Sequence, residues 1–147
     1  MDMNREKRKF VFEQLFMLEF YDQNEADAQL ENLEQDSDLL QEMESDVLDE
    51  DARQAMKDKA RDIFARKEEL DAQINQVATG WKTHRMGRAE LAAIRLALYE
   101  ILFDDKVPYR VSINEAVELA KTYGGDDSPG FVNAVLGRLV RALDLSE

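Results

Sequence analysis

Hydrophobic residues recur along this chain at steps of three and four positions, the spacing that places them on one face of an α-helix. The strict alternation that marks strands is scarce, and only two prolines and six glycines interrupt the helical pattern. We therefore predict an all-α fold, a compact helical bundle of six to seven helices, in a single domain that spans residues 1–147.

The apolar positions predict helices with bounds near 4–21, 51–79, 88–103, 112–123 and 129–143. The helix at 88–103 is apolar on nearly all sides, which is typical of the buried centre of a bundle. We expect Gly80 to end the helix before it, because glycine accepts a left-handed cap without strain. The tetrapeptide Ser112-Ile113-Asn114-Glu115 has the S-x-x-E pattern of a capping box and predicts the start of the next helix.

The turn before the last helix has its own signals. Gly124-Gly125 marks the end of one helix, and Pro129 suits the first turn of the next. Between them, Asp127 and Ser128 carry the side-chain oxygens that accept hydrogen bonds from helix N-terminal amides. We expect one of these two residues to cap the last helix.

Charge is distributed unevenly along the chain. The net charge of -13 argues against nucleic-acid binding, and residues 10–52 contain 15 acidic side chains and no Lys or Arg. Within this stretch, residues 22–50 fit short helices through their scattered Leu and Met, and they equally fit a mobile acidic loop. By contrast, the first nine residues contain a basic cluster, made of Arg5, Lys7, Arg8 and Lys9. Because a phosphate responds to charges within about 8–10 Å, this local cluster matters more than the total.

Several functions lack the residues they need. The chain has no cysteine, and its single histidine, His84, has no metal-ligand partner at a plausible spacing. The acidic run Asp49-Glu50-Asp51 lacks the central glycine of a calcium loop. No apolar run is long enough to span a membrane, and charged residues follow Met1. We expect a cytoplasmic protein that is not an enzyme, binds no metal or cofactor and has no membrane partner.

The C-terminal half carries a specific resemblance. Its motifs are Arg95-Leu-Ala-Leu-Tyr-Glu100, Val107-Pro-Tyr-Arg-Val-Ser-Ile-Asn-Glu-Ala-Val-Glu-Leu-Ala-Lys121, Tyr123-Gly124 and Phe131-Val-Asn-Ala-Val-Leu136, with Gly80-Trp81 before the central helix. In this order they resemble the NusB family of transcription antitermination factors, densely over residues 80–138 and more loosely before them. The resemblance implies an all-α fold that binds single-stranded boxA RNA of ribosomal RNA transcripts. It also implies a ribosomal-protein partner, the NusE subunit, a place in the RNA polymerase antitermination complex and, in some members, a homodimer.

The resemblance also implies site residues. The basic cluster resembles the family's arginine-rich RNA-binding segment, and Arg5 and Arg8 would share a helix face. Phe16 stands where the family commonly has tyrosine, while the turn at Asp127-Ser128 and Phe131 would lie at the RNA surface. Each has a structural alternative: a solvated helix start for the cations, the core for Phe16 and Phe131, and capping for Asp127 and Ser128.

The family's ribosomal-protein partner docks near the start of the central helix, so Arg88 and Glu90 are candidate contacts. Tyr109, beside Pro108, fits either a binding rim or a cover over the core. Arg95 is expected to be buried and paired with a carboxylate such as Glu118.

Two other functions compete with this interpretation. The first is a protein-interaction or dimerising regulatory factor with little intrinsic RNA binding, in which the acidic surface matters most. The second is the helical domain at the front of an RNA cytosine methyltransferase family, for which 147 residues leave no room for a cofactor-binding α/β domain.

Overall fold

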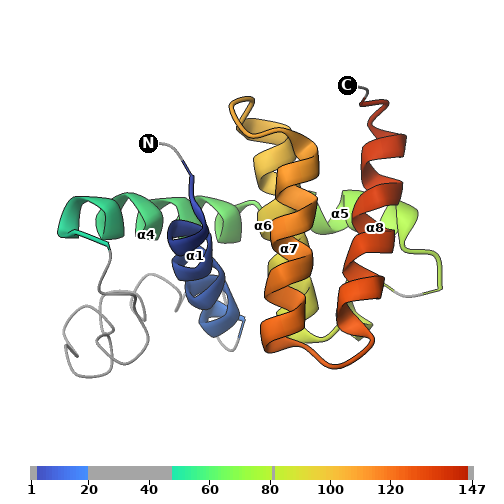
Figure 1. Ribbon diagram of the computed structural model, residues 1–147. Coiled ribbons are helices and arrows are strands. Elements are labelled where there is room, and N and C mark those ends of the chain that lie inside the picture. Colours follow the sequence, from blue (N-terminus) through green and yellow to red (C-terminus); the bar gives the residue numbers. More distant parts are fainter. Residues whose placement is uncertain (1–2, 20–47, 81, 146–147) are drawn as a thin grey trace. The chain divides into compact units, whose positions relative to one another are not determined.

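The computed structural model describes residues 3–19, 48–80 and 82–145, and it divides the chain into two compact units, Met1–Ala65 and Arg66–Glu147 (Figure 1). These residues form six α-helices and a short 3-10 helix, with no strand among them. The all-α prediction is confirmed. Most of the acidic segment at 22–50 lies outside the described residues, so its conformation stays a prediction, as does the single domain.

The first unit contains α1 (Arg5–Leu18) and α4 (Glu50–Ala65), which pack against each other. α1 begins where the sequence predicts, because the Asn4 side chain accepts a hydrogen bond from the Lys7 amide at 2.9 Å. Asp49 does the same for α4, accepting from the Ala52 amide at 2.7 Å. The predicted end of the first helix near Tyr21 lies outside the described residues.

The helix predicted over 51–79 is wrong as a single element. The structure ends α4 at Ala65 and begins α5 (Lys67–Val77) after Arg66, whose backbone leaves helical geometry with φ -95° and ψ 8°. Neither glycine nor proline stands at this position, and apolar residues keep their helical spacing on both sides of it, so the sequence does not indicate the break. Gly80 does adopt the left-handed conformation, with φ 77°, although α5 already ends at Val77.

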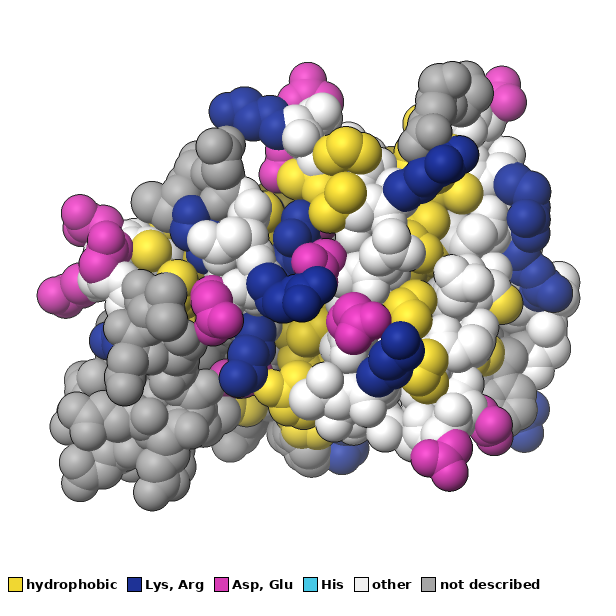
Figure 2. Space-filling view, viewed as in Figure 1, with side chains coloured by type: hydrophobic (Ala, Val, Ile, Leu, Met, Phe, Trp, Pro, Cys, Tyr) yellow, Lys and Arg dark blue, Asp and Glu magenta, His cyan; other side chains and the backbone are white. Residues whose placement is uncertain are grey.

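The second unit contains α5, the 3-10 helix Thr83–Arg85, α6 (Arg88–Phe103), α7 (Tyr109–Tyr123) and α8 (Ser128–Ala142). The last three helices alternate in direction and lie side by side, and α5 packs across α6 and α8 (Figure 1). Every residue from Leu91 to Leu98 of α6 is buried, which confirms that this helix is the centre. Apolar side chains follow the seam between α7 and α8, with charged side chains on their outer faces (Figure 2).

The predicted capping box at Ser112 is wrong. α7 begins at Tyr109, directly after Pro108, so Ser112 lies within its first turn. Its side chain is 1% exposed, and its hydroxyl donates to Glu100 Oε2 of α6 at 2.9 Å. The S-x-x-E pattern therefore marks a buried contact between α6 and α7.

Arg95 is buried as predicted, but its partner is Asp71 of α5. The guanidinium donates from Nε to Oδ1 at 2.8 Å and from Nη2 to Oδ2 at 2.6 Å. Glu118, the partner named from sequence, instead pairs with Lys121 at 3.1 Å. Burial raises the pKa of Asp71 to about 6 and lowers the pKa of Arg95 to about 10, so desolvation opposes both charges. The two hydrogen bonds offset that cost and join α5 to α6.

Within the part of the chain that the structure describes, no helix combines the length and hydropathy needed to cross a membrane.

Candidate nucleic-acid interface

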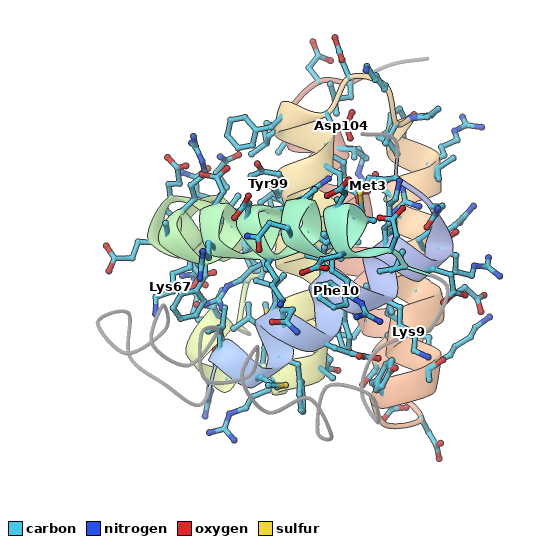
Figure 3. The ribbon with its side chains drawn as sticks, turned by 90° about the vertical axis from the view of Figure 1, so that its left-hand side faces the viewer. Met3, Lys9, Phe10, Lys67, Tyr99 and Asp104 are labelled. Carbon is cyan, nitrogen blue, oxygen red and sulfur yellow. The ribbon has the colours of Figure 1, made fainter. Side chains whose placement is uncertain are left out.

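The basic cluster occupies the first turns of α1, and its members differ in exposure. Arg5 and Lys9 are exposed and four positions apart, so they share one face of the helix. Lys7 is half-buried, whereas Arg8 is only 5% exposed. In Figure 3, Phe10 lies at the contact with α4. The structure therefore presents Arg5 with Lys9, rather than Arg5 with Arg8, as the pair of cations most open to a ligand.

Phe16 lies further along α1 and is half-buried. Its ring stacks on the buried Phe12 ring, with centroids 6.2 Å apart and an interplanar angle of 25°. The ring thus contributes to the packing of its unit and keeps part of its surface accessible. An RNA contact by Phe16 stays a prediction.

The turn between α7 and α8 is held by a hydrogen-bond network that starts on α6. The Ser128 hydroxyl donates to Glu90 Oε2 at 2.8 Å and accepts from the Gly125 amide at 3.1 Å. The other oxygen of Glu90, Oε1, accepts from the Gly87 amide at 3.0 Å. We call these contacts the Glu90–Ser128 network.

This network corrects the expected capping of α8. Asp127 stands at the N-cap but makes no side-chain capping bond, and Ser128 is the first helical residue, bonded to Glu90 and Gly125. At the start of α6, by contrast, the Glu90 side chain does accept a hydrogen bond from a backbone amide, that of Gly87. Sequence reasoning missed it, although a glutamate three positions after Gly87 is the spacing that could have revealed it.

The structure does not bring all predicted site residues of this unit together. Asp127 is exposed, and Phe131 is half-buried in the first turn of α8, where its amide donates to Asp127 O at 3.1 Å. Arg88 is exposed and Glu90 half-buried at the start of α6. Tyr109 is half-buried at the start of α7, the end of this antiparallel helix pair opposite to Arg88 and Glu90 (Figure 1). A small contact surface at the start of α6 that includes Arg88 and Glu90 therefore does not include Tyr109.

No group of three or more His, Asp or Glu side chains that could hold a metal ion occurs among residues 3–19, 48–80 and 82–145. In the second unit, the turn before α8 instead presents the exposed Asp127 carboxylate next to the half-buried Phe131 ring. Such a surface can bind a ligand through hydrogen bonds and through the exposed part of an aromatic ring.

These features define an all-α protein that presents cations on its first helix and a polar turn between its last two helices. A family model described as the NusB family matches residues 5–141, so the chain belongs to the NusB family.

Named relatives agree with this assignment. The transcription antitermination protein NusB of Agathobacter rectalis is 48% identical over 137 residues, which cover 92% of this chain and 98% of the relative. The protein of the same name from Clostridium botulinum is 36% identical over 141 residues, covering 94% and 100%.

Solved structures agree as well. T. maritima NusB matches with a TM-score of 0.73 and 32% identity, covering 96% of this chain and 93% of that one. The solution structure of NusB from Aquifex aeolicus, at 23% identity and a TM-score of 0.72, shows the shared fold.

Proposed function

We propose that this chain is a transcription antitermination factor that binds single-stranded, boxA-like RNA of ribosomal RNA transcripts. It acts together with the ribosomal-protein subunit NusE and joins the RNA polymerase antitermination complex in the cytoplasm. It works by binding and not by catalysis, and it needs no cofactor. The observation that carries this proposal is the family match over residues 5–141, supported by relatives named transcription antitermination protein NusB.

The exposure of Arg5 and Lys9 supports RNA contact at the first helix. In a chain with a net charge of -13, two cations open to solvent on one helix face offer a local site for phosphates. Lys7 and Arg8 stay part of the proposed segment, but their burial gives them less surface for RNA. In the second unit, the accessible part of Phe131 suits stacking on a base.

Arg88 and Glu90 remain the proposed partner contacts at the start of α6, with Tyr109 as a separate contact. The partner in this proposal is a ribosomal protein, a class that is typically basic and therefore complementary to the net charge of -13 of this chain.

The first prediction concerns the two exposed cations. The double change Arg5→Ala/Lys9→Ala should weaken binding to a boxA-like RNA and make the salt dependence shallower by about 1.4 in the log–log slope, since each lost phosphate contact removes roughly 0.7. The measurement is a fluorescence-anisotropy titration at several salt concentrations.

The matched control is Lys106→Ala/Arg141→Ala, which removes the same charge from exposed positions. Both lie at the end of the second unit that is opposite to the turn between α7 and α8 (Figure 1). If the two double variants lose affinity and slope equally, the RNA contact at α1 is refuted and only a general charge effect remains.

The second prediction concerns the partner. Residues 10–52 contain 15 acidic side chains, which repel phosphate, so we expect weak RNA binding by the chain alone and tighter binding when NusE is present. Gel-shift titrations with and without the partner measure the difference. Equal affinity in the two series would contradict the prediction, and partner binding without any RNA binding would favour the protein-interaction alternative.

A further inference from the structure

We propose that Glu90 is a positioning residue for RNA recognition. Its carboxylate joins the start of α6 to the turn between α7 and α8 and thereby fixes the segment that carries Asp127 and leads into Phe131. This inference rests on the proposed RNA-binding function. It assigns Glu90 a role that is distinct from a direct contact with the protein partner.

The geometry uses both carboxylate oxygens. Oε1 accepts from the Gly87 amide at 3.0 Å, and Oε2 accepts from the Ser128 hydroxyl at 2.8 Å, across 38 positions of the chain. Ser128 is 6% exposed, and its hydroxyl also accepts from the Gly125 amide at 3.1 Å. Hydrogen bonds to a charged acceptor are stronger than those between neutral groups, so the Glu90 carboxylate is a strong polar anchor for this turn.

The same turn is held from its other side by close packing. A Cβ atom on Gly124 would lie 2.6 Å from the Cβ and Oγ atoms of Ser128. Ser128 is therefore fixed between Gly124 and Glu90, and α8 begins at this residue. Because Phe131 follows three residues later in the first turn of α8, the orientation of its ring depends on where Ser128 is held.

The sign of the expected effect separates positioning from simple electrostatics. A carboxylate near an RNA surface repels phosphate, so its removal by itself should strengthen binding. If Glu90 positions the turn, its removal should weaken binding despite the loss of a negative charge. A change in the unfavourable direction therefore cannot come from charge alone.

The experiment measures binding of a fluorescent boxA-like RNA to the full chain without any ribosomal protein. We expect Glu90→Ala and Ser128→Ala each to lower the affinity about fivefold. The double variant should lose no more than the more affected single variant, because both changes break one network. Circular dichroism at the assay temperature verifies that each variant is folded.

Two control variants match these changes. Ser112→Ala removes another buried serine that donates to a glutamate, at 2.9 Å, but at the opposite end of α7 from the turn. It should lower stability and leave RNA affinity unchanged. If a loss of stability were enough to weaken RNA binding, Ser112→Ala would weaken it as Ser128→Ala does. Asp105→Ala removes an exposed carboxylate between α6 and α7 and should not weaken binding.

Should Glu90→Ala fail to fold, Glu90→Gln replaces it, because glutamine can still accept from the Gly87 amide but offers no second oxygen to Ser128. Unchanged or tighter RNA binding by the Glu90 variants, or a loss that appears only with the ribosomal partner, would overturn the inference. The control for the underlying function is the wild-type chain: absence of RNA binding there, with and without NusE, would reject the proposed function itself.

Discussion

Replacing Gly124 with alanine will lower the free energy of unfolding by about 2–3 kcal/mol, because the new methyl group overlaps atoms that cannot easily move away. The added Cβ would lie 2.6 Å from Ser128 Cβ and Oγ and 2.9 Å from the backbone oxygen of Ala120. Gly124 has φ -101°, which other residues also adopt, so the cost comes from crowding and not from backbone strain. Urea denaturation monitored by circular dichroism measures the change.

The neighbouring glycine provides the control. A Cβ on Gly125 would meet nothing within 4 Å, so Gly125→Ala should change the unfolding free energy by less than about 1 kcal/mol. Equal losses for the two variants would mean that this turn tolerates no side chain at either position, and the specific contact between Gly124 and Ser128 would be refuted. RNA affinity should follow the same order, since the crowded variant also displaces Ser128 from Glu90.

The two glycines show what the sequence reveals about this turn. As a pair they mark the end of α7, and the structure indeed places Gly124 at the C-cap. Their different roles depend on Ser128 folding back toward Gly124 and on Glu90 reaching it from another helix. Such tertiary contacts leave no periodic signal, so the end of the helix was predictable and the network that fixes the turn was not.

The same limit explains the helix boundaries. α6 was predictable because burial on nearly all sides produces a continuous apolar run. The break at Arg66 was not, because neither glycine nor proline marks it, and the contact of the Arg66 guanidinium with Phe103, 4.7 Å from the ring centroid, joins residues far apart in the sequence. The capping-box prediction at Ser112 was wrong for a related reason. Ser112 is buried and bonds Glu100, yet its spacing to Glu115 is the same as that of a helix cap.

In the candidate site, sequence identified the residue types but not their exposure. The cations of the first turn of α1 stand close together in the chain, yet Arg8 is buried while Arg5 and Lys9 are open. Helical spacing predicts which residues share a face, but it does not predict which face the core takes when polar residues surround it. The types of residue in the candidate site could therefore be read from the sequence, whereas the exposure of each side chain, which depends on packing, could not.

The buried ion pair between α5 and α6 yields the other large expected effect. Arg95→Met should lower the free energy of unfolding by about 3 kcal/mol, because it leaves the Asp71 carboxylate largely buried without its cation. The side chains of Arg95 and Asp71 are only 7% and 20% exposed, so water replaces little of what is lost. Adding Asp71→Leu to that variant should restore most of the stability, since two apolar side chains need no partner.

A pH series identifies the stranded carboxylate as the cause. Burial raises the pKa of Asp71 from 3.8 to about 6, so without Arg95 the folded chain holds this proton more tightly than the unfolded chain. The stability of Arg95→Met, relative to Arg95→Met/Asp71→Asn, should therefore be greatest below pH 3.8 and decline as the pH rises through about 6, because removing the cation cannot lower the pKa of this carboxyl group. The amide of the second variant does not titrate, so other carboxylates cancel in the comparison. Parallel pH profiles for the two variants would place the lost stability in packing around the arginine stem rather than in an uncompensated charge.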